Sequence, residues 1–300
     1  MITIKDLIER YSGVVRENEP LKRHSTIRIG GPADFFCQPQ SEQELMQLFR
    51  LVRDRNVPIV IIGKGSNILF SDEGFRGIVI QPGSRLGEMR MVEPDLLEAG
   101  CAVDSVSLIR FCADHELSGL EYLIGMPSML GGAIAMNAGA YGQEIGNMVE
   151  RLRLVNADGI SELDRKDIGF SYRKTTGLQD RFIVKAWLRL GSVSRDKAYT
   201  HTREVLAKRM ETQPLDKHSL GSVFKRVPDN FPGKLIEDAG CKGMRKGDIE
   251  VSTMHANFFI NRGAGTAADM IALIDEVKQR VMENSNIELP LEIKLIGFDS

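Results

Sequence analysis

The alternation of apolar and polar positions predicts a mixture of helices and strands in the N-terminal part of the chain. Residues 41–56 repeat apolar side chains at helical spacing, with Ser41 as the N-cap and Glu44 three residues later, as a capping box requires. The apolar run 58–62 predicts a buried strand and is far too short to span a membrane. Residues 1–20 are expected to form an N-terminal helix that begins with a short amphipathic stretch.

The same patterns continue through the rest of the chain. Asp104 is a good N-cap for a helix over 104–117, and Thr266 is a good N-cap for an amphipathic helix over 266–284. A charged helix is expected over 196–211. Strands that alternate with helices indicate an α/β or α+β protein. The further strands are expected at 77–80, 95–101, 149–157, 182–190 and 291–296, with a hairpin turn at 157–159.

Length, composition and charge narrow the class of protein. A chain of 300 residues suggests two domains, and a break in character places a boundary near 193–200. Hydrophobic residues make up 42% of the chain, which excludes wholesale disorder. The 39 Lys and Arg residues nearly balance the 41 Asp and Glu residues, which argues against a general nucleic-acid binder. Charges within residues 1–11 exclude a signal peptide, so a soluble, cytoplasmic protein without a membrane partner is expected.

The cysteines and histidines do not form a recognisable metal site. Cys37, Cys101, Cys112 and Cys241 include no CxxC pair and have no histidine cluster beside them, so we expect reduced, mostly buried thiols. His255 lacks partners at ligand spacing, and a hydrogen-bonded structural role is favoured over metal ligation. No metal is therefore expected.

Two glycine-rich segments are candidates for cofactor binding. The turn 63–67 follows an apolar strand, and its N–H groups could converge on phosphate oxygens, although a plain tight turn explains it as well. The long run of small residues over 119–142 would let the backbone lie against something flat or polyanionic. Close packing of a helix on the sheet is the alternative for this run.

Three polar residues in other segments are candidates for chemistry. Arg173 lies among aromatic residues and could clamp a carboxylate, or it could simply be a surface arginine. Ser222 is not part of a nucleophile elbow, and a turn serine is the alternative reading. Glu292 lies in an apolar strand, where a charge is costly unless it is paired or acts as an acid; the alternative is an edge-strand residue facing solvent.

Taken in order, several segments resemble the UDP-N-acetylenolpyruvoylglucosamine reductase (MurB) family of flavoenzymes. The resemblance runs from about residue 20 to residue 297, and each piece is modest alone. The shared order and spacing of the pieces carry the resemblance. The matching pieces are residues 24–33, 63–67 with Asp72, 137–142, 172–173, 221–225 and 289–292.

The resemblance implies an α+β fold in which an FAD-binding region of the PCMH, or vanillyl-alcohol-oxidase, type is followed by a C-terminal substrate domain. The implied domains are an N-terminal helix at 1–20, an FAD-binding region at 21–193 and an α+β substrate-binding domain at 194–300. The FAD-binding region would consist of two α+β subdomains, at about 21–80 and 81–193. The chain lacks the tyrosine-bearing insertion of one branch and so resembles the shorter type II form.

The resemblance also implies which residues form the site. Arg173, Ser222 and Glu292 match the catalytic residues, and Tyr172, Lys225 and Arg226 are expected to bind the substrate. FAD would be bound by Arg28, Ile29, Gly30, Gly31, Gly63, Lys64, Gly65, Ser66, Asn67, Gly125, Met126, Pro127, Gly131, Gly132, Asn137, Ala138 and Gly139.

The implied reaction is reduction of a vinyl ether that carries a carboxylate, UDP-N-acetylglucosamine enolpyruvate. NADPH would reduce FAD, and flavin N5 would pass hydride to C3 of the enolpyruvyl group. Arg173 and Glu292 would stabilise the enolate, and Ser222 would protonate C2.

Two departures from the family pattern concern residues near the expected site. Arg226-Val227-Pro228 replaces the usual Asn-Pro after Phe-Lys, and Ser128 replaces a glycine beside the expected flavin site. Two other functions remain open: a different flavin oxidoreductase of the same fold that acts on an alcohol, and a non-catalytic protein that binds FAD or a sugar nucleotide.

Overall fold

The computed structural model describes residue 7 and residues 12–298, which divide into two compact units. The chain passes from one unit to the other within β1 (Val14–Pro20), β2 (Pro32–Gln38), β5 (Phe75–Ile80) and α5 (Arg195–Thr212), and between Gly63 and Lys64. The domains expected from the sequence are continuous stretches of chain, whereas each compact unit consists of separate segments. The domain boundary near 193–200 therefore stays a prediction. Unit 1 contains the described residues up to Glu17 with Phe35–Gly63 and Gly77–Ala207, and unit 2 contains Asn18–Asp34, Lys64–Arg76 and the described residues from Lys208 onward.

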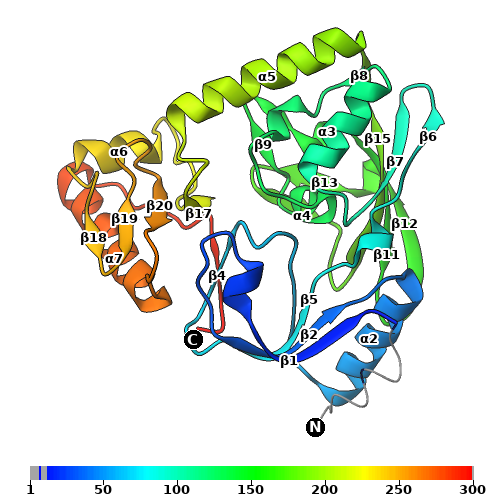
Figure 1. Ribbon diagram of the computed structural model, residues 1–300, viewed down its shortest axis with the longest axis horizontal. Helices are drawn as coiled ribbons and strands as arrows, with labels where there is room; N and C mark the ends of the chain where they lie inside the picture. The colour runs from blue at the N-terminus through cyan, green and yellow to red at the C-terminus, as the bar shows by residue number, and fades with distance from the viewer. Residues whose placement is uncertain (1–6, 8–11, 299–300) are drawn as a thin grey trace. The chain divides into compact units, whose positions relative to one another are not determined.

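Unit 1 is built around a five-stranded antiparallel sheet with the order β12-β11-β15-β7-β6 (Figure 1). The strands predicted over 95–101, 149–157 and 182–190 are confirmed as β7, β11 and β15, and the predicted hairpin joins β11 to β12. Helix α4 packs on β7 and β15. The bounds are β6 Met89–Glu93, β7 Leu96–Gly100, β11 Val149–Val155, β12 Ile160–Asp164, β15 Phe182–Arg189 and α4 Leu130–Ala135.

The predicted helix over 41–56 is confirmed as α2, Glu42–Arg55, but its capping box is wrong. The Ser41 side chain accepts a hydrogen bond from the Glu44 N–H at 3.2 Å, as expected of an N-cap. The Glu44 carboxylate does not return to the Ser41 N–H. It accepts instead from the Gln40 N–H at 2.7 Å and from Ser12, because these groups lie closer to it.

A four-stranded sheet has the order β1-β2-β5-β3, in which β3 and β5 are parallel. Strands β3 and β5 confirm the predictions over 58–62 and 77–80. The predicted helix over 1–20 is wrong over its second half, where the chain is strand β1; residues 1–6 and 8–11 lie outside the described residues. The bounds are β1 Val14–Pro20, β2 Pro32–Gln38, β3 Ile59–Ile61 and β5 Phe75–Ile80.

Unit 2 contains an antiparallel sheet with the order β17-β20-β19-β18, and helix α7 packs on β18, β19 and α6 (Figure 1). The predicted helix over 266–284 is confirmed as α7, and Thr266 and Asp269 form its capping box. Strand β21 pairs in parallel with β4. The bounds are β4 Ile68–Phe70, β17 His218–Ser222, α6 Pro232–Asp238, β18 Arg245–Lys246, β19 Ile249–Val251, β20 Phe258–Asn261, α7 Ala267–Ser285 and β21 Lys294–Ile296.

The remaining elements are mostly short. The Asp104 N-cap is confirmed, but α3 ends at Asp114 rather than at residue 117, because the chain turns into β8. The charged helix expected over 196–211 is α5, Arg195–Thr212. The others are α3 Ser105–Asp114, β8 Leu117–Ser118, β9 Gly139–Ala140, β10 Gln143–Glu144, β13 Gly169–Ser171, β14 Lys174–Thr176, β16 Gly191–Ser192, and 3₁₀ turns at Leu21–His24, Ser84–Leu86, Glu121–Leu123, Ile145–Asn147 and Arg165–Asp167.

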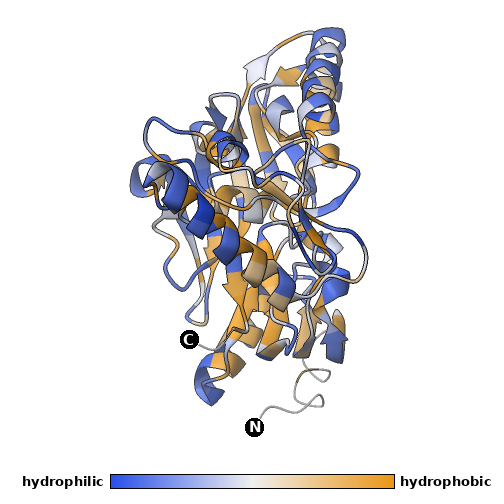
Figure 2. Ribbon diagram, turned by 90° about the vertical axis from the view of Figure 1, so that its left-hand side faces the viewer, coloured by the Kyte–Doolittle hydropathy of each residue, from blue (hydrophilic) through white to orange (hydrophobic). Residues whose placement is uncertain are grey.

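Each unit has its own apolar core. Figure 2 shows apolar residues concentrated along the strands, and the buried clusters lie within unit 1 or within unit 2. The four cysteines are buried and reduced, which confirms the prediction, and burial raises the thiol pKa of Cys37 and Cys112 to about 12. Among the described residues, no helix is long and apolar enough to cross a membrane.

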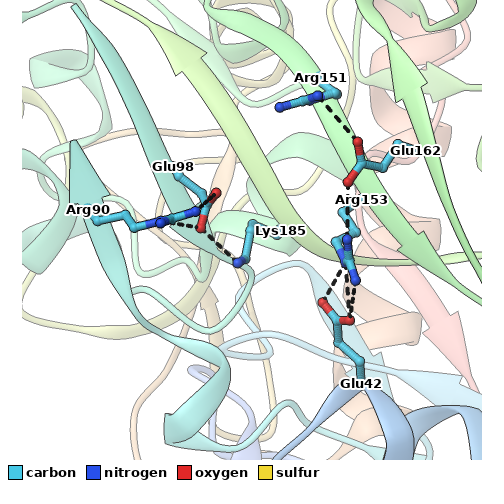
Figure 3. Close-up of polar contacts among 7 residues, drawn as sticks. All are labelled: Glu42, Arg90, Glu98, Arg151, Arg153, Glu162 and Lys185. Atoms are coloured by element: carbon cyan, nitrogen blue, oxygen red, sulfur yellow. Dashed lines mark hydrogen bonds and ion pairs between the residues drawn. The ribbon is translucent and has the colours of Figure 1, made fainter. Parts of the chain in front are cut away.

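Ion pairs join neighbouring strands on one face of the unit 1 sheet (Figure 3). Glu98 on β7 is 5% exposed and accepts from Arg90 on β6 at 2.8 and 2.9 Å and from Lys185 on β15 at 2.8 Å. These cations hold the pKa of the Glu98 carboxyl well below its usual range, at about 2. Arg153 on β11 bridges Glu162 on the next strand and Glu42 at the start of α2.

Glu98→Gln should destabilise unit 1 at neutral pH. A folded-state pKa of about 2 corresponds to about 3 kcal/mol of unfolding free energy, present above the ordinary glutamate pKa and lost as pH falls toward 2. Denaturant unfolding of both proteins between pH 3 and 7 measures this difference, which should shrink at low pH. Glu162→Gln is the control: its side chain is 37% exposed, so its removal should cost under about 1 kcal/mol. A Glu98→Gln effect independent of pH would contradict the assignment.

Candidate functional site

The turn after β3 is held in unit 2 by the segment that follows β1. The carbonyl oxygen of Gly65 accepts from the Thr26 N–H at 3.2 Å and from the Ser25 hydroxyl at 3.4 Å. Gly65 has a φ of +63°, and a Cβ there would lie 2.0 Å from the His24 carbonyl oxygen. Only glycine therefore allows this close approach, which places Lys64–Asn67 against the residues that precede Arg28.

The same turn is bonded to the segment that carries Glu292. The strand expected over 291–296 is present only over Lys294–Ile296, as β21, so Glu292 precedes the strand rather than lying in it. The Asn67 side-chain amide donates to the Glu292 carbonyl oxygen at 3.2 Å, and the Asn67 carbonyl oxygen accepts from the Lys294 N–H at 2.9 Å. These bonds continue into the parallel pairing of β4 with β21. Two residues that the sequence assigned to different roles, Asn67 and Glu292, are therefore neighbours in unit 2.

Glu292 is also paired with the segment that carries Ser222. Its N–H donates to the Val223 carbonyl oxygen at 2.8 Å, and the Lys225 N–H donates to the Pro290 carbonyl oxygen at 2.8 Å. Ser222 ends β17 and directly precedes this pairing. The structure thus brings Ser222, Lys225 and Glu292 together on two adjacent main-chain segments, although they are far apart in the sequence.

A further hydrogen bond closes a circuit of segments in unit 2. The Thr26 hydroxyl donates to the Ser219 carbonyl oxygen on β17 at 2.6 Å. The path therefore runs from Thr26 to Gly65 and Asn67, on to Glu292, across to Val223, and back along β17 to Thr26. We call this closed path the unit 2 circuit, and every expected site residue of unit 2 lies on it or within a few residues of it.

The expected cofactor segment Arg28–Gly31 is anchored beside this circuit. Asn261, 5% exposed at the end of β20, donates from its amide to the Ile27 carbonyl oxygen at 2.9 Å. A Cβ at Gly31 would lie 2.1 Å from the Asp72 carbonyl oxygen, so the backbone at 31 and 72 must touch. Arg28 has a φ of +62° and an exposed side chain, while Ile29 is buried in the unit 2 core, so its side chain packs within the protein.

Asn257 is a residue of this site that the sequence did not reveal. It is 4% exposed, and its amide bonds both the N–H and the carbonyl oxygen of Phe224, each at 2.9 Å. Its own carbonyl oxygen accepts from the Val223 N–H at 2.9 Å. The side chain therefore acts as a strand partner for the segment after Ser222. No periodic pattern marks such a residue, so only the structure could find it.

In unit 1, three expected cofactor residues line one pocket of about 160 Å³. Gly131 approaches Cys101 closely, since a Cβ there would lie 2.9 Å from the Cys101 Cβ, whereas a Cβ at Gly132 would meet nothing within 4 Å. Close packing is therefore observed at Gly131, while Gly132 faces open space, and binding of a flat or polyanionic group by this run stays a prediction. The third residue is Gly63, and the walls are Ile61, Ile62, Pro82, Cys101, Met129, Ala135, Leu178, Arg181, Phe182 and Ile183.

This pocket suits one part of FAD. Its walls are largely apolar, as a flat aromatic ring system requires, and Arg181 adds one cation that the sequence analysis did not select. The volume is below the ~300–1,000 Å³ typical of sites for whole drug-sized ligands, so the pocket has room for only a portion of a dinucleotide. The residues present therefore fit the expected cofactor.

Arg173 lies in the two-residue turn of the hairpin β13–β14 in unit 1. Its φ is +55°, and its guanidinium donates to the Gly139 carbonyl oxygen at 3.0 Å. Asn137, completely buried, donates to the Ser171 carbonyl oxygen in the same hairpin at 3.0 Å. Arg173, Asn137 and Gly139 are thus brought together, while neighbouring Tyr172 is 48% exposed.

The expected cofactor residues before α4 are fixed by the start of α3. The Ser105 hydroxyl donates to the Met126 carbonyl oxygen at 2.7 Å, and the Ser105 N–H donates to the Ser128 carbonyl oxygen at 3.1 Å. Gly125 has a φ of +77°, and Pro127 is exposed. Ser128, which replaces the glycine of the family pattern, thus has its main chain fixed by the hydrogen bond from the Ser105 N–H.

The two remaining polar candidates have different surroundings. The Arg226 guanidinium stacks at 4.5 Å over the ring of Phe231, which is 61% exposed. His255 accepts from the Asn257 N–H at 3.3 Å and packs edge-on against Phe258, and burial lowers its pKa, so the ring is a neutral structural group. Among the described residues, no group of three or more His, Cys, Asp or Glu side chains could hold a metal ion.

Comparison with known families matches both parts of the chain. Residues 33–163 match an FAD binding domain, and residues 213–296 match the C-terminal domain of UDP-N-acetylenolpyruvoylglucosamine reductase. These matches confirm the expected α+β organisation, with an FAD-binding region followed by the C-terminal domain of this family.

Individual proteins agree with this assignment over nearly their full length. The chain is 38% identical to a reductase of this name from Caldanaerobacter subterraneus subsp. tengcongensis, over 97% of this chain and 98% of the relative. It is 39% identical to one from Heliobacterium modesticaldum, over 96% of this chain and 92% of the relative. The crystal structure of MurB from Thermus caldophilus superposes with a TM-score of 0.81 at 30% identity, covering 95% of this chain and 99% of that one. The chain therefore belongs to the UDP-N-acetylenolpyruvoylglucosamine reductase family.

Proposed function

We propose that this protein is a UDP-N-acetylmuramate dehydrogenase. It reduces the enolpyruvyl group of UDP-N-acetylglucosamine enolpyruvate to give UDP-N-acetylmuramate, a precursor of peptidoglycan, with FAD as cofactor and NADPH as reductant. Family membership over nearly the whole chain supports the reaction class. The observation that carries the residue assignment is the pairing of Glu292 with Val223, which sets Ser222 and Glu292 on adjacent segments.

The two polar residues of unit 2 have complementary tasks in this proposal. Bound FAD, once reduced by NADPH, supplies the hydride that reaches C3 of the enolpyruvyl group. Ser222 then delivers its hydroxyl proton to C2; a hydroxyl is a weak acid, but the carbanion it meets is a strong base. Glu292 acts in its protonated form, or by orienting a donor, because a bare carboxylate would repel the enolate.

Arg173 is assigned to the substrate carboxylate. A guanidinium can donate two parallel hydrogen bonds to a carboxylate, and its positive charge stabilises the negative charge that develops there. Its turn is held by Gly139 and Asn137, so the group is oriented before the substrate arrives. Tyr172, Lys225 and Arg226 are assigned to substrate binding.

An anaerobic titration of the purified protein tests the whole proposal. NADPH should bleach the flavin absorption, and UDP-N-acetylglucosamine enolpyruvate should then restore it rapidly and stoichiometrically. A flavin that is reduced but not reoxidised would overturn the substrate assignment and favour another flavin oxidoreductase. A protein that cannot take up FAD would overturn the cofactor assignment and favour a binding protein.

Ser222→Ala should slow reoxidation of the reduced flavin by the substrate by about 10²–10⁴-fold, because protonation of C2 loses its donor. Reduction by NADPH should stay near the wild-type rate. Stopped-flow absorption resolves the two half-reactions. Ser219→Ala is the matched control, since it removes a hydroxyl three residues earlier on β17 whose contact to the Gly221 N–H is 3.5 Å long. An equal loss in both half-reactions would rule out the proton-donor role.

Arg226→Asn should raise the KM for the substrate about tenfold if the guanidinium binds the diphosphate, because a hydrogen bond to a charged group contributes about 1.5–3 kcal/mol. The rate of flavin reduction by NADPH should not change. Arg280→Asn, which breaks an exposed ion pair with Glu276 on α7, is the control for loss of one surface arginine. An unchanged KM in Arg226→Asn would remove this residue from the substrate site.

A further inference from the structure

Asn137 occupies a backbone position that glycine would fill more readily. It follows Met136, the C-cap of α4, and has a φ of +43°. The Ala138 N–H donates to the Ala133 carbonyl oxygen at 2.8 Å, and the Asn137 N–H donates to the Ile134 carbonyl oxygen at 2.9 Å. This is the Schellman pattern that ends helices, in which the left-handed residue is usually glycine. The backbone alone therefore does not explain an asparagine, and the reason must lie in its side chain.

The Asn137 side chain is fully engaged by the protein. Its amide nitrogen donates to Glu144 Oε2 at 2.7 Å and to the Ser171 carbonyl oxygen at 3.0 Å. Its amide oxygen accepts from the Gly146 N–H at 3.0 Å. Both amide hydrogens are thus used, and the residue is 0% exposed. These contacts leave no amide hydrogen for another partner, and the assignment of Asn137 to the cofactor stays a prediction.

All these contacts converge on the hairpin that carries Arg173. Ser171 is the last residue of β13, and the turn begins immediately after it. Gly146, bonded to the Asn137 amide oxygen, also supports the hairpin, because a Cβ there would lie 2.4 Å from the Phe170 ring. Gly139, which accepts from the Arg173 guanidinium, lies two residues after Asn137 on the same segment.

We infer that Asn137 is a positioning residue for Arg173. Its amide links the segment after α4 to Glu144, Gly146 and the hairpin β13–β14, and so fixes the turn whose guanidinium is assigned to the substrate carboxylate. This inference rests on the proposed role of Arg173. A misplacement of about 1 Å in a binding group can cost about 10²-fold in rate, so loss of the tether should be visible in the substrate half-reaction.

Asn137→Gly is the most direct variant, because glycine keeps the left-handed backbone and removes only the side chain. Reoxidation of the reduced flavin by the substrate should slow by about 10- to 100-fold. Bound flavin per chain and the rate of reduction by NADPH should stay near wild type. A variant that loses flavin, or slows equally in both half-reactions, would assign Asn137 to the cofactor or to general stability and overturn the inference.

A pair of variants distinguishes the effect of the Asn137 contacts on catalysis from their effect on stability. Asn137→Asp keeps the acceptor for Gly146 but loses both donated bonds and sets a carboxylate against Glu144. Adding Glu144→Gln restores a hydrogen bond between positions 137 and 144, but none to Ser171. The double variant should therefore recover melting temperature while substrate reoxidation stays slow. Glu144→Gln alone is the control and should behave as wild type. Recovery of full reoxidation in the double variant would contradict a role through Ser171.

A double-mutant cycle with Arg173→Lys tests whether Asn137 acts through Arg173. If it does, Asn137→Gly should slow reoxidation much less in the Arg173→Lys background than in wild type. Fully additive effects would overturn the inference. Thr175→Val offers an independent variant, since it removes the hairpin's other bond to α4, from the Thr175 hydroxyl to the Ile134 carbonyl oxygen, and should slow the same half-reaction. Failure of the wild-type protein to be reoxidised by the substrate would instead count against the proposed function.

Discussion

The unit 2 circuit of main-chain-directed hydrogen bonds is the constraint on which this site depends. Several of its members are irregular segments next to short strands such as β17 and β21, yet each must stay within hydrogen-bonding distance of the next. Glycine makes this possible where backbones touch, as at Gly65, where any side chain would collide with the His24 carbonyl oxygen. The functional side chains then project from a framework whose geometry they do not themselves determine.

The sequence was informative where periodicity is strong and where long segments bury one face. The helices at 41–56 and 266–284 and the central strands β7, β11 and β15 follow from apolar spacing alone. The N-terminal strand β1 and the hairpin β13–β14 do not, because exposed strands carry little apolar signal. The capping box at Glu44 failed because a carboxylate has several N–H groups in reach, and only the fold decides between them.

Some features of the candidate site could likewise be predicted from the sequence, whereas others are visible only in the structure. The sequence pattern marked Arg173, Ser222 and Glu292 as candidates but left a structural alternative open for each, and only the resemblance supplied their expected roles. Glu292 is hydrogen-bonded to Val223, and Asn257 is hydrogen-bonded to Phe224. These residues are far apart in the sequence, so a single sequence cannot reveal the contacts. Asn137 was selected as part of a glycine-rich run, but only its contacts show that its side chain faces the protein.

Asparagine recurs at these joints for a physical reason. Asn67, Asn137, Asn257 and Asn261 each use the side-chain amide to bond the main chain of another segment. An amide carries both donor and acceptor, so it can complete backbone hydrogen bonds where two loops cannot form a ladder. It is also neutral at every pH the protein meets, unlike Asp, Glu, Lys or Arg. Within each unit these segments are thereby fixed without a buried charge, so no unpaired buried charge has to be neutralised there.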